Sequence, residues 1–201
     1  MPSRSLAIGL CLLAGLAGVR AQDALLKRDA DIMDKKIAAI VTRGNLAPAK
    51  TKPSALRTSF TETEVNAYFK YIAPPLLPVG VVDPRVVIEE GGRLRARAMV
   101  NLDAVRTSKT RSMLDPMNYI TGTLEVTAVG TLRASEGRGT FTIESTTLGG
   151  VPIPRTLLQE LVYYYSRTAE DPDGFNLDKP FDLPVKILAV EIRRAGATVV
   201  Q

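Results

Sequence analysis

The chain of 201 residues contains no histidine and no tryptophan, and its single cysteine is Cys11. The absence of histidine excludes a Ser-His-Asp triad, a Cys-His pair and nearly every zinc site. A single cysteine also excludes a disulfide within the chain, so the fold depends on its hydrophobic core. We therefore expect a protein that is not an enzyme and that uses no cofactor.

Two weaker catalytic patterns remain, and neither is convincing. "TSKT" at residues 107–110 has a serine and a lysine without the surrounding motif of a Ser-Lys hydrolase, which favours a solvated loop. Glu89 and Glu90 are paired carboxylates at an expected hairpin turn, but adjacent strand residues point to opposite faces. Neither pattern changes the expectation of a non-enzyme.

The first residues have the layout of a secretory signal peptide. Arg4 precedes an apolar run from Leu6 to Val19, and the sequence fits cleavage after Ala21. The run of about 14 residues is short against the roughly 20 that span a bilayer, so an uncleaved anchor is the less favoured alternative. We expect residues 1–21 to be removed and the protein to be periplasmic or secreted.

Removal of this segment would lower the net charge from +5 to +3, because the segment contains two arginines and no acidic residue. This mild positive charge permits attraction to anionic lipid headgroups and a peripheral membrane contact, and no dense basic cluster indicates a nucleic-acid partner. The expected organisation is an N-terminal helix with a Pro/Lys linker over 22–57 and a single domain over 58–201.

Two amphipathic helices are predicted before the first strands. The first covers about 22–42, and its apolar stripe, suited to a partner helix, consists of Leu26, Ala30, Met33, Ile37 and Ile40. The second covers about 61–73, where Thr61 and Glu64 form a capping box. Its apolar face consists of Val65, Tyr68, Phe69 and Ile72, and Pro74 and Pro75 end it.

The middle of the chain has the alternation of antiparallel strands. A hairpin is expected to turn at Glu90–Gly92, followed by a strand whose apolar positions are Leu94, Ala96, Ala98, Val100 and Leu102. Its opposite, wet face carries Arg93, Arg95, Arg97, Asn101 and Asp103. The next pair of strands turns at "SEGRG", with Leu124, Val126, Ala128, Leu132, Phe141 and Ile143 facing inward.

A third helix is predicted from about Pro154 to Ser166, and a last hairpin turns near Ala195 and Gly196. The order of elements lacks the βαβ alternation of a parallel sheet. The predicted fold class is α+β: a curled antiparallel β-sheet wrapped over two or three helices, with the apolar face of the sheet packed on them.

Two loops resemble ligand sites only superficially. "LGGVPIP" at 148–154 lacks a phosphate-loop motif, and its prolines remove backbone donors that a phosphate needs. The loop Asp171–Asp178 holds several oxygen ligands without the spacing of an EF-hand, so an Asx turn is favoured over calcium. We therefore expect no metal site.

The stretch "TSFTETEVNAYF" resembles the "fT-x-x-E-x-N" helix start of small secreted bacterial proteins of the tubular lipid-binding (TULIP-like) superfamily. "RLRARAMVNLD", "GTFTIESTTLGGVPIPRTLLQEL" and "KPFDLPVKILAVEI" follow in the order of that group, with a "G-x-P-x-P-x-x-L" entry into a helix. The resemblance covers about Thr58 to Gln201. It implies a sheet wrapped around a helix, an apolar groove for a lipid chain and no catalytic residues.

The leading hypothesis is a periplasmic lipid-binding or lipid-handling protein that holds an acyl chain or another amphipathic molecule between sheet and helices. The predicted lining residues are Val65, Phe69, Ile72, Leu158, Leu161 and Tyr165, with Arg95 and Arg97 at anionic headgroups. The alternative is an envelope protein–protein interaction module with a solid core and no ligand. In that case the Leu26–Ile40 stripe would pair with another helix.

Overall fold

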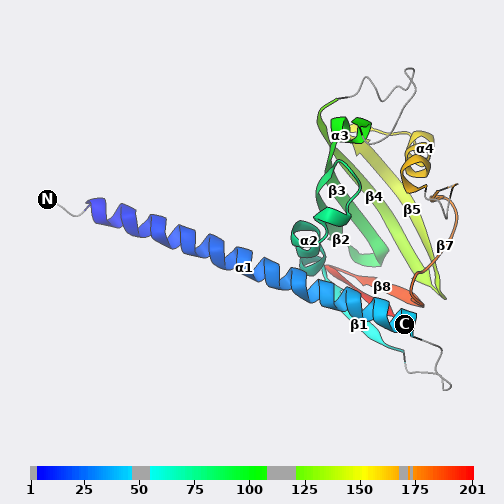
Figure 1. The fold of residues 1–201 in the computed structure, drawn as a ribbon, viewed down its shortest axis with the longest axis horizontal. Helices are drawn as coiled ribbons and strands as arrows, with labels where there is room; N and C mark the ends of the chain where they lie inside the picture. Colours follow the sequence, from blue (N-terminus) through cyan, green and yellow to red (C-terminus); the bar gives the residue numbers. More distant parts are fainter. Residues whose placement is uncertain (1–3, 47–54, 108–120, 168–171, 173) are drawn as a thin grey trace.

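The computed structural model describes residues 4–46, 55–107, 121–167, 172 and 174–201, with side chains from Gln22 onward except at 105–107, 161, 164 and 165. It consists of an open antiparallel sheet of nine strands with helices packed on it, which confirms the predicted α+β class (Figure 1). In chain order the elements are α1 (Arg4–Asn45), β1 (Arg57–Thr61), α2 (Glu62–Tyr71), η1 (Pro74–Leu76), β2 (Val81–Ile88), η2 (Glu90–Gly92), β3 (Arg93–Asn101), α3 (Leu102–Thr107), β4 (Thr123–Ser135), β5 (Arg138–Leu148), β6 (Val151–Pro152), α4 (Arg155–Ser166), β7 (Phe181–Asp182), β8 (Ala189–Arg193) and β9 (Gly196–Val200).

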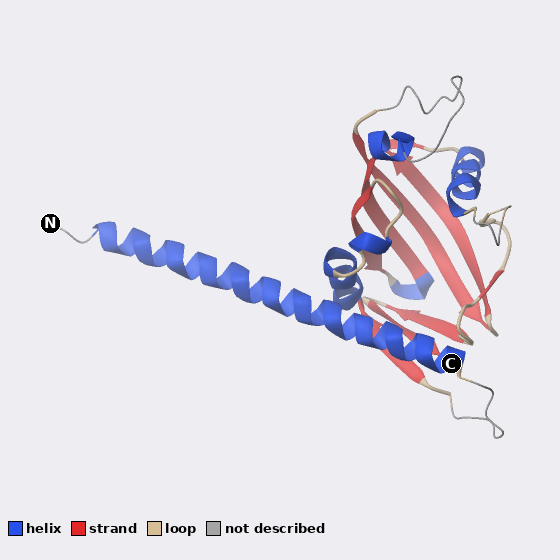
Figure 2. Cartoon of the chain, viewed as in Figure 1, coloured by secondary structure: helices blue, strands red, loops and turns tan. Residues whose placement is uncertain are grey.

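The sheet consists of two parts that meet along β4 (Figure 2). The larger part contains β2, β3, β4 and β5, with the two-residue strands β6 and β7 added to β5. The smaller part contains β1, β9 and β8, and β8 joins β4 through the pair Ala134 and Val190. Two backbone hydrogen bonds add to this junction, from Ala195 N–H to the carbonyl oxygen of Ile88 (2.8 Å) and from Gly137 N–H to that of Leu188 (2.8 Å).

The hairpin turns lie where the sequence predicts them. Glu136 and Gly137 connect β4 to β5 with φ angles of 53° and 76°, the left-handed pair that a tight type I′ turn requires. Gly149 and Gly150, with φ angles of 58° and 81°, form a second tight turn between β5 and β6. The "LGGVPIP" stretch is therefore a hairpin corner that leads into α4.

The strand expected to continue through Leu102 and Asp103 ends earlier, at Asn101. The side-chain oxygen of Asn101 accepts a hydrogen bond of 3.0 Å from the backbone N–H of Ala104, three residues on. This is the geometry of a helix N-cap, and it starts the short helix α3. The predicted strand at Leu102 and Asp103 is therefore wrong, because the side chain of Asn101 caps a helix that begins at Leu102.

The larger part of the sheet has two chemically different faces. The inner face carries Leu94, Ala96, Ala98 and Val100 of β3, paired in register with Gly130, Ala128, Val126 and Leu124 of β4. Leu132 and Phe141 continue it between β4 and β5. The outer face carries Arg93, Arg95 and Arg97. This division confirms the predicted apolar and wet faces of β3.

The most completely buried side chains gather mainly where α1 and α2 meet each other and the smaller part of the sheet. Ala30, Met33 and Ile40 of α1 are buried, as are Ala67 of α2 and Val199 of β9. Gln201 fixes the end of the chain here, because its side-chain amide donates to the carbonyl oxygens of Ile40 (2.9 Å) and Val185 (2.7 Å). Among the described residues, no helix has the length and apolar character to cross a membrane.

Candidate functional site

Helix α2 is held at one wall of the inner face by a dense set of hydrogen bonds. The predicted capping box is present: Thr61 Oγ1 accepts from the N–H of Glu64 (3.2 Å), and Glu64 Oε2 accepts from the N–H of Thr61 (2.9 Å). Such a cap satisfies two donors at the start of the helix. The sequence motif "TETEVN" therefore begins with a structural device.

The same motif also fastens α2 to β2. The side-chain amide of Asn66 makes two hydrogen bonds to the backbone of Val86. Its Nδ2 donates to the carbonyl oxygen (2.7 Å), and its Oδ1 accepts from the N–H (2.8 Å). One turn earlier, Glu62 Oε2 accepts from the N–H of Ile88 (2.7 Å). Because β2 is the last strand of this side of the sheet, Glu62 and Asn66 occupy backbone groups that would otherwise lack a strand partner.

Helix α1 supports α2 from the other side. Lys36 Nζ donates to both carboxylate oxygens of Glu64, at 2.7 and 2.8 Å. Near the opposite end of α2, the hydroxyl of Tyr71 donates to Asp23, and Lys70 lies 3.5 Å from the same carboxylate. The bond from Tyr71, with attraction from Lys70 and Lys27, holds the pKa of Asp23 below its ordinary value of 3.8. The Leu26–Ile40 stripe thus lies on a helix that packs against α2 of its own chain.

Helix α4 forms the opposite wall, and the bonds described for it go mainly to a loop. Its N-cap is Pro154, which provides no side-chain cap. Gln159 donates to the carbonyl oxygen of Phe175 (3.2 Å) and accepts from the N–H of Leu177 (2.9 Å). Ser166 Oγ accepts from the N–H of Phe175 (2.6 Å). The helix is therefore joined chiefly to the loop around Phe175–Asp178, where Arg155 also pairs with Asp178.

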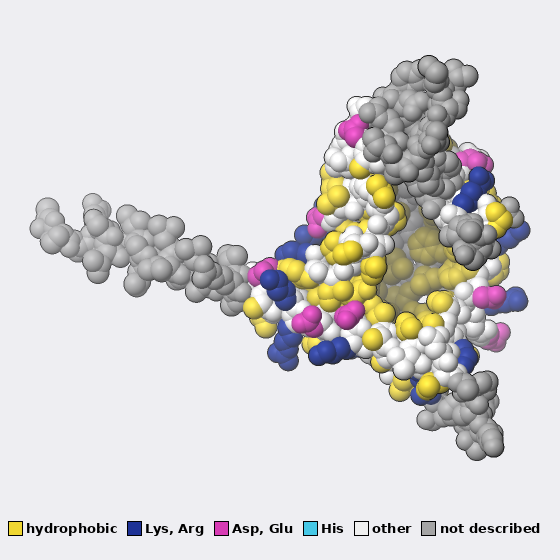
Figure 3. Space-filling view, in the orientation of Figure 1, with side chains coloured by type: hydrophobic (Ala, Val, Ile, Leu, Met, Phe, Trp, Pro, Cys, Tyr) yellow, Lys and Arg dark blue, Asp and Glu magenta, His cyan; other side chains and the backbone are white. Residues whose placement is uncertain are grey.

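Between these two walls the inner face is hollowed. Figure 3 shows hydrophobic side chains gathered in a hollow in front of the sheet, between α2 and α4. Leu94, Ala96, Ala98, Val100 and Val126 of the inner face are only half-buried. An apolar surface of this kind in a hollow is able to shelter an apolar ligand from water.

The predicted lining residues lie on α2 and α4, the two walls of the hollow. Val65, Phe69 and Ile72 are half-buried and share one side of α2, at spacings of four and three residues. Leu158 of α4 is half-buried as well. Leu161 and Tyr165 belong to α4, but their side chains lie outside the described part of the structure. The apolar positions of β3 and β4 are additional lining residues that the prediction did not include.

Arg95 and Arg97 lie on the outer face, away from the hollow, because Leu94, Ala96 and Ala98 alternate with them on β3. Each is more than half exposed and has an acidic partner: Arg95 lies 3.3 Å from Glu89 and Arg97 lies 3.4 Å from Glu125. The structure therefore does not bring these arginines together with the helical lining residues.

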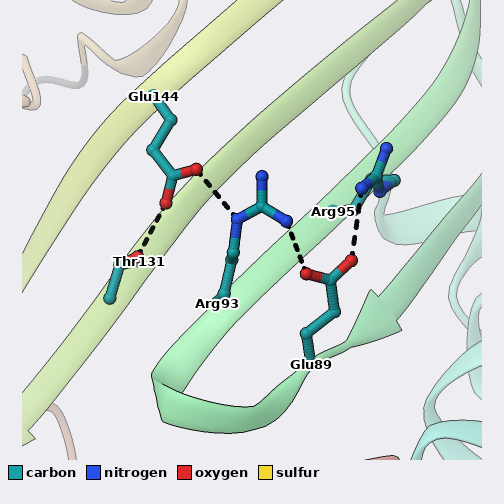
Figure 4. A network of polar contacts seen from close by, with 5 residues as sticks. All are labelled: Glu89, Arg93, Arg95, Thr131 and Glu144. Carbon is teal, nitrogen blue, oxygen red and sulfur yellow. Dashed lines mark hydrogen bonds and ion pairs between the residues drawn. The ribbon is translucent and has the colours of Figure 1, made fainter.

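The outer face instead carries an extended ion-pair network (Figure 4). Arg93 bridges Glu89 (2.6 Å) and Glu144 (2.9 Å), and Thr131 donates to Glu144 (2.9 Å). The bond from Arg93 lowers the pKa of both carboxylates, with help from Arg95 at Glu89 and from Thr131 at Glu144. Pairs of this kind across neighbouring strands support the sheet.

A cavity of about 350 Å³ opens beside this network, against β2 and β3. Arg85, Arg95 and Arg97 line it together with Glu62 and Asn66. Arg85 lies directly opposite Arg97 in the register, but it has its own partner, Asp83, at 3.5 Å. Each of these three arginines thus lies within 3.5 Å of a carboxylate oxygen.

Metal ligation finds no support in the described part of the chain, which contains no group of three or more candidate ligands. In the loop considered for calcium, Asn176 Oδ1 accepts from the N–H of Asp178 (2.8 Å), and Asp178 pairs with Arg155. This is the Asx turn that the sequence favours. Asp171 and Asp173 lie outside the described residues.

Comparisons with protein-family models, with curated proteins and with solved structures find no match. The assignment of function therefore rests on the geometry of the chain itself. The sequence-based prediction did not include the bonds of Glu62 and Asn66 to the edge of β2. The signal that could have indicated them is their spacing of four residues at the start of an amphipathic helix, which places two polar side chains on one side of it.

Proposed function

We propose that the protein binds a lipid, or another amphipathic molecule with a long apolar chain, in the hollow between α2 and α4. The observation that carries this proposal is the half-buried inner face of β3 and β4, whose side chains are all apolar from Leu94 to Val100 at every second position. Burial of an acyl chain is favourable by about 0.8 kcal/mol per CH₂ group. The resemblance to TULIP-like proteins supports the same ligand class.

The proposed lining joins the inner face to the walls. Val65, Phe69 and Ile72 supply one wall and Leu158 supplies the other. Leu161 and Tyr165 remain predicted lining residues. Arg95 and Arg97 are left out of this lining because they belong to the outer face. No step of bond chemistry is proposed, and the role is to hold or hand over a ligand in the periplasm or outside the cell.

The test is native mass spectrometry of the protein purified from the envelope, comparing the wild type with Ala98→Phe. Ala98 is on the inner face, so a phenyl ring there displaces part of the chain. Loss of about two buried methylene groups weakens binding roughly tenfold.

The matched control is Met99→Phe, which places the same ring one residue further along β3, on the outer face. It is expected to keep the wild-type amount of lipid. Lipid-free wild-type protein, or equal losses in both variants, would sink the proposal.

An envelope interaction module is the second candidate, and one observation favours it. Besides its buried stripe, α1 leaves Leu25 (59% exposed) and Val41 (41% exposed) uncovered. If these side chains form a protein contact, the Leu25→Ser and Val41→Ser double variant should shift the protein to a smaller species in size-exclusion chromatography. An unchanged elution volume for a monomeric wild type speaks against self-association through α1.

A further inference from the structure

We infer that the segment from Pro74 to Val82, called the proline loop here, enters the interfacial region of a lipid bilayer. It extends the proposed function by naming where the protein meets a membrane. Three of its side chains are among the most exposed large hydrophobic groups of the described chain: Leu76 (73%), Val79 (60%) and Val82 (53%). Exposed apolar groups gathered on one short segment indicate a contact surface.

The first reason to choose a bilayer is charge. From Tyr71 to Val82 the sequence reads "YIAPPLLPVGVV", twelve residues without an acidic or basic side chain. The flanking charged residues, Lys70 and Asp83, lie just outside it. A segment with no charge loses nothing to ion desolvation when it moves from water into the boundary between headgroups and acyl chains.

The second reason is that the loop has few backbone N–H groups and that several of them donate within the segment. Pro74, Pro75 and Pro78 have no N–H group. The N–H groups of Leu76, Leu77 and Val81 donate within the segment to Ala73 (2.8 Å), Pro74 (3.4 Å) and Pro78 (3.0 Å). Unsatisfied backbone donors are costly in an apolar medium, so this loop is suited to it. A partner that adds a β-strand would instead need free donors.

The third reason is position. The proline loop leads into Val81, which pairs with Val100 at the end of the inner face. The register places the β5–β6 turn at the same end of the sheet, because β3 Val100 pairs with Leu124 and Leu148 pairs with Val126 and Val151. Val151, next to that turn, is 66% exposed as well. A bilayer at this end would meet both exposed apolar segments.

The first experiment uses the absence of tryptophan from the chain. Leu76→Trp places a single fluorophore in the loop, and Leu188→Trp places one at a control position that is 51% exposed at the other end of the sheet. The processed protein is mixed with phosphatidylcholine vesicles with or without brominated acyl chains. We expect a blue shift and bromine quenching for Leu76→Trp only. Equal spectra for both positions would overturn the inference.

The second experiment measures vesicle flotation of the double variant Leu76→Asp and Val79→Asp against Leu188→Asp. The double variant should bind neutral vesicles at least about tenfold more weakly than the wild type, because two apolar groups no longer leave water. Leu188→Asp should bind as the wild type does. All proteins share one N-terminus, so residues 1–21 cannot cause a difference. Thermal melting confirms that each variant is folded.

The outcomes separate this inference from the proposed function. Binding that requires anionic vesicles and disappears at high salt would assign the contact to the arginines of the outer face and overturn it. A change in oligomeric state instead of vesicle binding would assign the loop to a protein partner or a second copy. Lipid held by the wild type without any loop insertion defeats only the membrane contact, whereas loop insertion with an empty hollow defeats only the proposed ligand site.

Discussion

The two helices that border the hollow are fastened by the same chemistry to very different supports. Asn66 of α2 and Gln159 of α4 each use a side-chain amide to donate to one backbone carbonyl oxygen and accept from one backbone N–H. Asn66 bonds to a strand that is itself paired with β3, whereas Gln159 bonds to a loop. We therefore expect the bonds of Asn66 to contribute more to the global stability of the protein than those of Gln159.

The starts of the two helices differ in the same direction. Helix α2 has a capping box and ion pairs to α1, while α4 begins at a proline without a side-chain cap. Elements with few tertiary bonds open locally at a lower free energy than the rest of the protein. We therefore expect α4 to open locally at a lower free energy than α2.

The largest effect is expected from Asn66→Ala. It removes two hydrogen bonds to the half-buried backbone of Val86, at about 0.5–1.5 kcal/mol each, so the free energy of unfolding should fall by about 1–3 kcal/mol. Gln159→Ala should lower it by less than about 1 kcal/mol, because α4 opens without the sheet. Urea denaturation followed by circular dichroism measures both values.

Thr63→Ala, an exposed change on α2, is the control for Asn66→Ala and should be near neutral. Hydrogen exchange sharpens the comparison, since Gln159→Ala should accelerate exchange in α4 alone. Equal losses of global stability in Asn66→Ala and Gln159→Ala would show that α4 belongs to the core.

A smaller effect is expected at the helix starts. Thr61→Ala removes the cap of α2 and should cost about 1 kcal/mol of global stability. Pro154→Ser gives α4 the side-chain acceptor that its N-cap lacks. The free energy of opening of its first turn should rise by about a few tenths of a kcal/mol, after the lost rigidity of proline is counted, so that amide exchange there slows. Amide exchange by NMR compares the two. Faster exchange in Pro154→Ser would mean that the rigid proline contributes more than a cap.

The smallest effect concerns pH and the bond between α1 and α2. Because the pKa of Asp23 is lower in the folded protein than its ordinary 3.8, its stabilisation is present above that pH and is lost as the pH falls through the folded-state pKa. The melting temperature of the wild type should exceed that of Asp23→Asn at pH 7 by a small margin that disappears in acid. Asp31→Asn, an exposed change on the same helix, is the control. A margin that persists at low pH would contradict the assignment.

Much of the fold follows from local patterns in the sequence. Alternation predicts β3 and its two faces, the glycines predict the turns, and Thr61 and Glu64 predict the start of α2. These features depend on residues a few positions apart, which a single sequence displays. The failure at Leu102 has the same origin, since alternation continued by chance past the point where Asn101 starts a helix.

The candidate site was harder to predict, because it depends on contacts between distant residues. Alternation separates Arg95 from Ala96 and predicts the arginines on the wet face of β3, which is where the structure has them. The bonds from Asn66 to Val86 and from Gln159 to the loop at Phe175 join segments whose proximity no local pattern reveals. The different supports of α2 and α4 are therefore visible only in the structure.

The contact between α2 and β2 has a consequence for how the protein folds. The outermost strand of a sheet presents free backbone groups that can recruit another unfolded chain, and the product is an aggregate. Glu62 and Asn66 occupy such groups at Ile88 and Val86. Any intermediate in which the sheet has formed but α2 has not docked would therefore be the species most prone to aggregation, and a chaperone that shields this edge would improve the yield.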